Sequence, residues 1–166
     1  PYERTWFGWS GKVASHTRIA TQEVEHDKIT YITVDLSKED HREYYNGFAN
    51  RVLWPILHYR VDLAEFSRRD LSGYLRVNDH FARELHEVLG PDDLVWVHDY
   101  HLMLLPQMLR ERLRAQGKKN IKIGFFDDLP CSIVHHLLDR FRSNSITGVH
   151  QVFMEGAIPV FCLGVC

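Results

Sequence analysis

A short apolar segment in the second half of the chain runs directly into a cluster of ionisable side chains. Residues 94–97 are β-prone and follow a turn-forming Gly-Pro-Asp-Asp sequence, and His98, Asp99, Tyr100 and His101 come next. A carboxylate accepts hydrogen bonds from hydroxyl groups, and an imidazole can exchange hydrogen bonds or bind a metal ion. The sequence therefore predicts a buried strand that ends in a binding site centred on Asp99.

Two other roles compete for these residues. Asp99 could cap the helix that follows it, by accepting hydrogen bonds from the amides of the first turn. One carboxylate can cap a helix and bind a ligand only if one of its oxygens accepts the amide hydrogen bonds and the other binds the ligand. His98 and His101 invite a metal site, but His98 belongs to the strand end and no third ligand is nearby in the sequence. A metal site is therefore not expected.

The elements around this cluster indicate an α/β fold with a parallel sheet. An amphipathic helix is predicted at about residues 104–114, and a second apolar run follows at residues 121–126. Strand, helix and strand at this spacing form a βαβ unit, whose two strands are parallel. In open sheets of this kind, ligands bind beyond the carboxyl ends of the strands. Asp99 is expected at that edge.

Upstream, the pattern predicts two more strand segments and a helix start. The aromatic, glycine-containing residues 6–11 are expected to be a strand end that runs into a loop, and residues 28–36 alternate as a strand does. Ser37 is expected to cap a helix, with Asp40 in place of the usual glutamate of a capping box. That helix would continue toward Pro55.

Residues 70–89 form the clearest helix in the sequence. Apolar side chains recur there near the 3.6-residue period, and charged side chains take the opposite face. Gly90 and Pro91 are expected to end it.

Composition narrows the class of protein. The chain has 166 residues, 45% hydrophobic and 25% charged, with a net charge of -2, which is typical of one globular domain. The near-neutral balance gives no electrostatic case for nucleic acid, and no apolar run approaches the roughly 20 residues that span a bilayer. No charged-then-apolar signal segment is present, so a cytoplasmic location is expected. The first residue is proline rather than methionine, which indicates a fragment or a processed end.

The composition changes after residue 126. Only six of the last forty residues are charged, and all three cysteines, Cys131, Cys162 and Cys166, lie there. With no matching histidine spacing, these are expected to be free thiols rather than a zinc site. A helix at about residues 133–141 and an apolar strand at about residues 158–165 are the elements that the tail could form.

Six blocks of the sequence, in order, resemble one known family. It is glycosyltransferase family 20, the retaining α,α-trehalose-phosphate synthases. The blocks are FGWSG at 7–11, YYNGFAN at 44–50, LWPILHYR at 53–60, GYLRVN at 73–78, VWVHDYHL at 95–102 and IGFF at 123–126. Together they fall within about three quarters of the chain.

The resemblance implies an α/β fold with a Rossmann-like parallel sheet, the incomplete N-terminal domain of a two-domain GT-B glycosyltransferase. Residues 1–126 would form the partial acceptor-side domain, and residues 127–166 a diverged tail. The family transfers glucose from UDP-glucose to glucose 6-phosphate, with no cofactor. Its N-terminal half mainly holds the acceptor and its C-terminal half mainly holds the nucleotide sugar. UDP-glucose binding is thus expected only if a donor domain is supplied, and the chain alone is predicted to be inactive.

The family pattern also implies site residues. Tyr45, Trp54 and Asp99 match positions that line the acceptor site, and Trp9 matches less closely. A carboxylate can accept hydrogen bonds from a hexose, an aromatic ring can cover its C–H face, and a tyrosine hydroxyl can reach a phosphate oxygen. Without the motif, core packing would be favoured for both tryptophans. No catalytic residue is carried over, because Asp128 stands where the family has an active-site histidine.

Two other interpretations stay open. The chain could be a non-catalytic domain that binds a sugar phosphate or regulates a full-length synthase. The tail could instead be a sequence artefact, such as a frame disruption. A strand edge left uncovered by a missing half favours association, which leaves both homo- and hetero-oligomers open.

Overall fold

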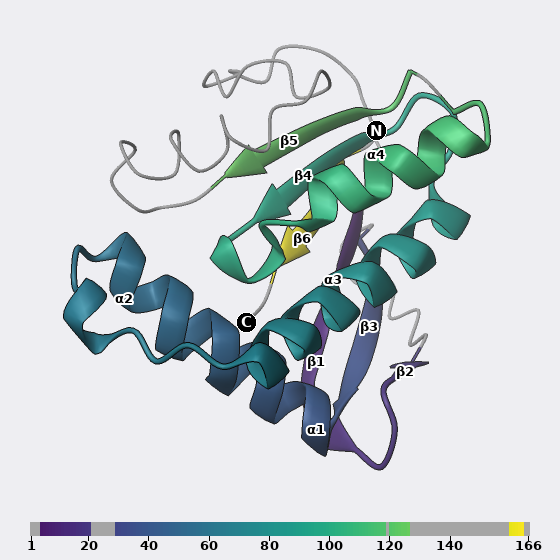
Figure 1. Ribbon diagram of the computed structural model, residues 1–166. Helices are drawn as coiled ribbons and strands as arrows, with labels where there is room; N and C mark the ends of the chain where they lie inside the picture. The colour runs from purple at the N-terminus through teal and green to yellow at the C-terminus, as the bar shows by residue number, and fades with distance from the viewer. Residues whose placement is uncertain (1–3, 21–28, 119, 127–159, 165–166) are drawn as a thin grey trace.

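The computed structural model describes residues 4–20, 29–118, 120–126 and 160–164. The strands in this part of the chain form one sheet in the order β2-β3-β1-β6-β4-β5 (Figure 1). All neighbouring strands are parallel except β2 and β3. The strands are β1 (Arg4–Ala14), β2 (Arg18–Ala20), β3 (Ile29–Ser37), β4 (Leu94–His98), β5 (Lys122–Phe126) and β6 (Val160–Gly164).

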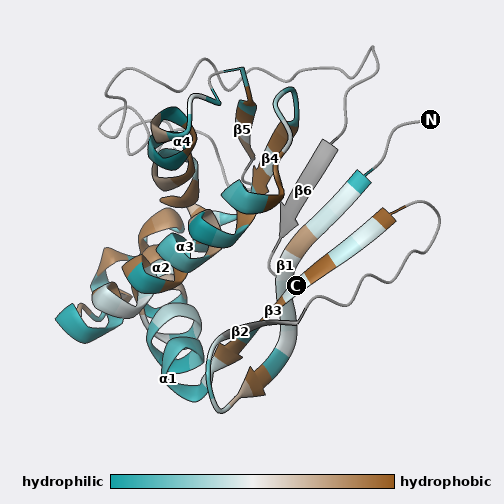
Figure 2. Ribbon diagram, turned by 90° about the vertical axis from the view of Figure 1, so that its right-hand side faces the viewer, coloured by the Kyte–Doolittle hydropathy of each residue, from teal (hydrophilic) through white to brown (hydrophobic). Residues whose placement is uncertain are grey.

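The helical segments connect these strands. They are α1 (Lys38–Asp40), the π-helix η1 (His41–Leu53), α2 (Trp54–Leu57), the 3-10 helix η2 (Val61–Leu63), α3 (Arg68–Val88), the 3-10 helix η3 (Tyr100–Leu102) and α4 (Leu105–Ala115). Figure 2 shows α1 to α4 gathered on one face of the sheet. The core lies between the two layers, where Phe7 of β1 meets Phe81 of α3 with ring centroids 5.6 Å apart.

The sheet is joined at its centre by a strand from the C-terminal tail. β6 pairs with β1 on one side and with β4 on the other, so it links the two halves of the sheet. It falls within residues 158–165, where the sequence predicts an apolar strand. The helix predicted at residues 133–141 lies outside the described residues. The division of the chain at residue 126 stays a prediction.

The cap predicted at Ser37 is present. Ser37 Oγ accepts a hydrogen bond from the Asp40 amide at 3.0 Å, and the chain turns from β3 into α1. The helix then differs from the expectation: from His41 to Leu53 it is a π-helix, in which the backbone hydrogen bonds reach one residue further back than in an α-helix.

The long helix α3 confirms the prediction made for residues 70–89. Ser67 caps it by accepting a hydrogen bond from the Asp70 amide at 3.4 Å. Its apolar stripe is buried against the sheet and η1, and it ends before Gly90. Strand β1 is longer than predicted, because the expected loop at residues 6–11 is a break in register between Trp9 and Val13. Gly11, at φ +77, takes the left-handed conformation that this irregularity requires.

Candidate functional site at the carboxyl end of strand β4

The predicted βαβ unit exists and places Asp99 where the sequence analysis expected it. β4 and β5 pair in parallel from Leu94 with Lys122 to His98 with Phe126, and α4 connects them. Asp99 is the first residue beyond the strand. It therefore lies at the carboxyl edge of the sheet, where open α/β folds bind their ligands.

Asp99 has an uncommon backbone conformation. Its φ of 76° and ψ of 150° fall in a region that is almost confined to glycine. Such a conformation costs on the order of 1–3 kcal/mol and persists only where the surroundings fix it. An aspartate kept in this position, at the edge of the sheet where ligands bind, is a candidate for function.

Two hydrogen bonds hold the Asp99 carboxylate. Oδ1 accepts the Tyr100 amide at 2.7 Å, and Oδ2 lies 3.0 Å from His101 Nδ1. Asp99 thus caps the short helix η3, whereas α4 begins at Leu105 and its N-cap residue, Leu104, makes no side-chain cap hydrogen bond. Each carboxylate oxygen can accept a second hydrogen bond, and the side chain is 35% exposed. The structure shows the capping role of Asp99, and its binding to a ligand stays a prediction.

The three aromatic residues predicted for the site are linked by a continuous series of ring contacts, and His101 in that series contacts Asp99. Trp9 meets Tyr45 with centroids 5.1 Å apart, and Tyr45 stacks on His101 at 4.9 Å and 19°. His101 meets Tyr100 at 4.2 Å, and Tyr100 meets Trp54 at 5.5 Å. Residues from β1, η1, α2 and η3 therefore form one aromatic surface around Asp99.

The π-helix explains how Tyr45 and Trp54 reach the same surface. Nine residues separate them, which is about two and a half turns of α-helix and would place them on opposite faces. Hydrogen bonds to the fifth residue back widen each turn to roughly four to five residues, so nine residues make about two turns. The Trp54 amide accordingly donates to Ala49 O. Asn50, between them, faces the same way and accepts a 2.8 Å hydrogen bond from the Tyr100 hydroxyl.

The two tryptophans differ in exposure. Trp54 is 45% exposed, so it is not a core residue. Trp9 is buried, and its indole N–H donates to Lys12 O at 3.0 Å. A ligand could contact Trp54 directly, whereas Trp9 mainly supports the ring of Tyr45.

The structure adds two supporting residues that the sequence analysis did not single out. The Tyr74 hydroxyl of α3 donates to Tyr100 O at 2.6 Å, and Asn78 Nδ2 donates to His101 O at 3.1 Å. Both side chains are buried. They hold the backbone of η3 against α3. In the sequence, only their place in the family block at residues 73–78 indicated that they could matter.

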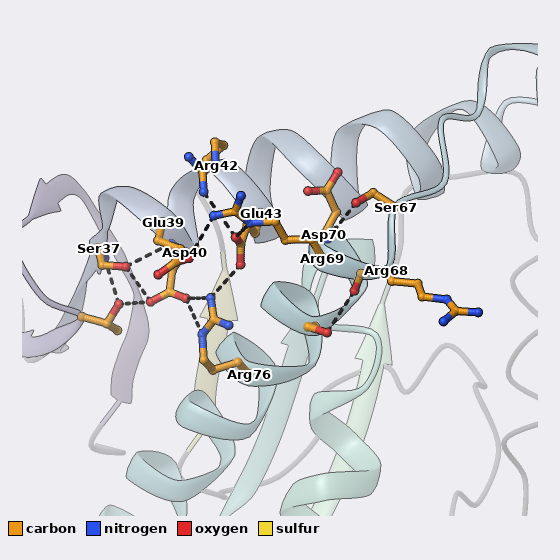
Figure 3. A network of polar contacts seen from close by, with 12 residues as sticks. Ser37, Glu39, Asp40, Arg42, Glu43, Ser67, Arg68, Arg69, Asp70 and Arg76 are labelled. Carbon is orange, nitrogen blue, oxygen red and sulfur yellow. Dashed lines mark hydrogen bonds and ion pairs between the residues drawn. The ribbon is translucent and has the colours of Figure 1, made fainter.

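The opposite side of η1 carries a charged cluster (Figure 3). Arg76 of α3 donates to Asp40 Oδ1 at 2.8 Å through Nε and to Glu43 Oε2 at 3.0 Å through Nη2. Glu43 also pairs with Arg69, and Asp40 with the Thr17 hydroxyl. Both carboxylates are buried.

The electrostatics of this cluster keep both carboxylates charged. Burial alone would raise the pKa of Asp40, but hydrogen bonds from Thr17, Arg76 and Ser37 outweigh it and lower the pKa. Burial would likewise raise the pKa of Glu43, and its arginine partners lower it. Their hydrogen-bond partners all belong to the fold, in α3, in η1 and, for Asp40, at Thr17 and Ser37, which indicates a structural role.

Within the part of the chain that the structure describes, no three or more histidine, cysteine, aspartate or glutamate side chains gather in a metal-binding arrangement. None of the described helices is long and apolar enough to cross a membrane.

A mainly parallel sheet, with a partly exposed carboxylate and an aromatic surface at its carboxyl edge, is typical of a Rossmann-like α/β domain. Residues 2–147 match glycosyltransferase family 20, and the chain belongs to this family.

Relatives of known name support the assignment. The chain is 48% identical over 126 residues to the trehalose-6-phosphate synthase of Sinorhizobium fredii, covering 75% of this chain and 26% of that protein. It is 46% identical over 125 residues to the trehalose-6-phosphate synthase of Cronobacter sakazakii, and the match covers 75% of this chain and 25% of that protein. The chain therefore spans about a quarter of the length of these relatives.

Solved structures give the same result. The α,α-trehalose-phosphate synthase (UDP-forming) from Burkholderia vietnamiensis is 46% identical, with a TM-score of 0.69 over 76% of this chain and 26% of that one. The α,α-trehalose-phosphate synthase (UDP-forming) from Burkholderia xenovorans in complex with glucose-6-phosphate is 42% identical, with a TM-score of 0.69. The match covers 84% of this chain and 30% of that one. These neighbours confirm the predicted fold class, a Rossmann-like α/β sheet that corresponds to part of a GT-B glycosyltransferase.

Proposed function

We propose that this chain binds glucose 6-phosphate as the acceptor side of a transfer of glucose from UDP-glucose that gives trehalose 6-phosphate. The observation that carries the proposal is the convergence of Tyr45, Trp54 and Asp99, with Trp9 behind Tyr45, on one aromatic surface. Tyr45, Trp54 and Asp99 match the family's acceptor positions in the sequence, and Trp9 matches them less closely. A relative solved with glucose 6-phosphate supports the choice of ligand.

The chemistry of each group suits a phosphorylated hexose. The lone pairs left on the Asp99 carboxylate would accept hydrogen bonds from sugar hydroxyls. The exposed ring of Trp54 would cover the C–H face of the sugar. The Tyr45 hydroxyl would donate to a phosphate oxygen.

Calorimetric titration of the purified chain with glucose 6-phosphate tests this assignment, with glucose and inorganic phosphate as separate ligands. We expect glucose 6-phosphate to bind more tightly than either of them. Trp54→Ala should weaken binding about tenfold, the effect expected from the loss of one ring contact. Trp6→Ala is the matched control, because Trp6 packs on Tyr31 away from the aromatic surface. Equal effects of the two substitutions would contradict the proposed site.

Turnover is a separate question, because the chain spans about a quarter of its relatives' length. Retaining transfer requires the acceptor hydroxyl to be positioned against the donor's anomeric carbon and the leaving diphosphate to be stabilised. We expect glucose 6-phosphate binding without trehalose 6-phosphate formation when UDP-glucose is added to the chain alone. That result agrees with the proposed acceptor-side domain and equally with the alternative, a sugar-phosphate-binding or regulatory domain that partners a full-length synthase. Formation of product would exclude it.

A further inference from the structure

His101 lies at the junction of the aromatic surface and the Asp99 carboxylate. Its ring stacks on Tyr45 and makes a tilted contact with Tyr100, and the residue is only 4% exposed. Its Nδ1 lies 3.0 Å from Asp99 Oδ2. Its other ring nitrogen, Nε2, is buried and makes no hydrogen bond to the described residues.

This geometry determines what the imidazole does for Asp99. A carboxylate oxygen only accepts hydrogen bonds, so Nδ1 must carry the proton that faces Oδ2. The Tyr100 amide already holds Oδ1 from the other side. With both oxygens held, the carboxylate cannot rotate about its side-chain bond, and its remaining lone pairs keep one direction. The Asp99 backbone adopts a conformation that is rare for aspartate, so the contacts with Tyr100 and His101 hold a strained residue as well as its carboxylate.

The backbone that carries His101 is itself fixed. Tyr74 and Asn78 hold the carbonyl oxygens of Tyr100 and His101 from α3. The imidazole therefore has a rigid base, and its stacking partners leave it little rotational freedom. A group held this firmly can transmit its position to the carboxylate that it contacts.

We propose that His101 is a positioning residue, which aims the Asp99 carboxylate at its ligand by donating a hydrogen bond from Nδ1 to Oδ2. The proposal rests on the proposed function, since the ligand used to test it is glucose 6-phosphate. It assigns no ligand contact to His101. Its effect on binding should be exerted entirely through Asp99.

Two substitutions separate the donor from the ring. His101→Phe keeps a planar ring for Tyr45 and Tyr100 but removes the donor, whereas His101→Asn keeps an amide donor near Nδ1 and removes the ring. If positioning is the role, His101→Phe should weaken glucose 6-phosphate binding at least about tenfold, the loss expected for a hydrogen bond to a charged group. His101→Asn should bind within about threefold of the unmodified chain. The reverse order would show that packing matters and would overturn the proposal.

A double-mutant cycle tests whether His101 acts through Asp99. In an Asp99→Ala background, His101→Phe should cause no further loss of binding, because there is no carboxylate left to position. If the loss of affinity in the double variant equalled the product of the losses in the two single variants, the two residues would act independently and the proposal would fail. Circular dichroism and urea unfolding of each variant show whether the compared chains are folded.

A spectroscopic measurement keeps this test separate from that of the proposed function. In ¹⁵N NMR spectra of the unmodified chain, His101 should show the Nδ1–H tautomer, and Asp99→Ala should abolish that preference. If the chain binds no glucose 6-phosphate yet this signature is present, the proposed function fails and the hydrogen bond that positions Asp99 stands. If His101 is an Nε2–H tautomer, or is unchanged by Asp99→Ala, the positioning role is wrong whatever the chain binds.

Discussion

The two sides of helix η1 are built from opposite kinds of contact. Toward α3, the buried carboxylates Asp40 and Glu43 are paired with arginines, and glycines allow the helices to approach closely. Toward η3, Tyr45 makes ring contacts, and the half-exposed Asp99 retains lone pairs. One helix thus has a side whose polar groups are satisfied within the fold and a side whose polar groups are available to a ligand.

The two sides of η1 show that polar groups can serve either the stability of the fold or the binding of a ligand. Charged residues attract attention in a sequence, yet the buried carboxylates Asp40 and Glu43 pair with arginines of α3 and fix the helices in place. We therefore expect substitutions in the charged cluster to lower the free energy of unfolding. Substitutions on the aromatic surface should lower ligand affinity with less effect on folding. Four predictions test that division, from the largest expected effect to the smallest.

The largest effect should come from Arg76→Leu. The substitution leaves Asp40 without its arginine and removes one partner of Glu43 inside a buried contact. We expect the free energy of unfolding to fall by about 3 kcal/mol, the lower end for breaking a buried pair, because Arg76 is itself half exposed. Urea unfolding followed by circular dichroism measures it.

Arg83→Leu is the matched control on the same helix. Arg83 pairs with Glu84 at the surface, and its loss should change stability by no more than about 0.5 kcal/mol. Similar losses for the two variants would show that the buried cluster has no special role.

The second prediction concerns the close contact between the two helices. A Cβ atom on Gly73 would lie 2.3 Å from Glu43 Cβ, so Gly73→Ala must push η1 away from α3. We expect a loss of about 2 kcal/mol from overpacking, although alanine is the better helix former. Ser72→Ala, at the exposed neighbouring position, should be neutral or slightly stabilising. A stable Gly73→Ala chain would mean that the two helices can separate without cost.

The third prediction follows from the lowered pKa values of Asp40 and Glu43. Their pKa values lie below the ordinary 3.8 and 4.5, so the unfolded chain takes up protons first as the pH falls. The stabilisation is complete above the ordinary values and is lost as the pH drops through the lowered ones, from about pH 5 toward pH 2. Arg76→Leu should flatten this dependence, because burial would then raise the pKa of Asp40. Urea unfolding midpoints of the unmodified chain and of Arg76→Leu, measured across this pH range, test the prediction. It would be wrong if the midpoints of both chains changed equally with pH.

The sequence analysis predicted the regular elements but not the geometry that joins them. Periodicity identified α3, and alternation identified β3, because burial of one face leaves a repeating pattern of apolar residues. The π-helical hydrogen bonding of η1 leaves no such pattern, since the same side chains suit an α-helix. The pairing of Arg76 with Asp40 joins residues 36 positions apart and depends on how the helices pack.

The candidate site shows the same limit. The position of Asp99 beyond β4 followed from the βαβ spacing, and Tyr45 and Trp54 came from the family pattern. The role of His101 did not follow, because its contact with Asp99 depends on a backbone conformation that aspartate rarely adopts. Sequence spacing alone treated His98 and His101 as equivalent candidates, whereas the fold places His101 among the aromatic rings of the site.

The last prediction uses the Asp99 backbone to separate folding from binding in one residue. Asp99→Ala and Asp99→Gly both remove the hydrogen bonds to Tyr100 and His101, but only glycine takes a φ of 76° and a ψ of 150° without strain. We expect the glycine variant to be more stable than the alanine variant by about 1 kcal/mol in urea unfolding. Both should bind glucose 6-phosphate more weakly than the unmodified chain in calorimetry, while keeping an affinity that can be measured. If the two variants were equally stable, Asp99 would not be strained. If the glycine variant kept the full affinity of the unmodified chain, the carboxylate would not contact the ligand. The aromatic surface would then have a structural role, as the charged cluster on the other side of η1 does.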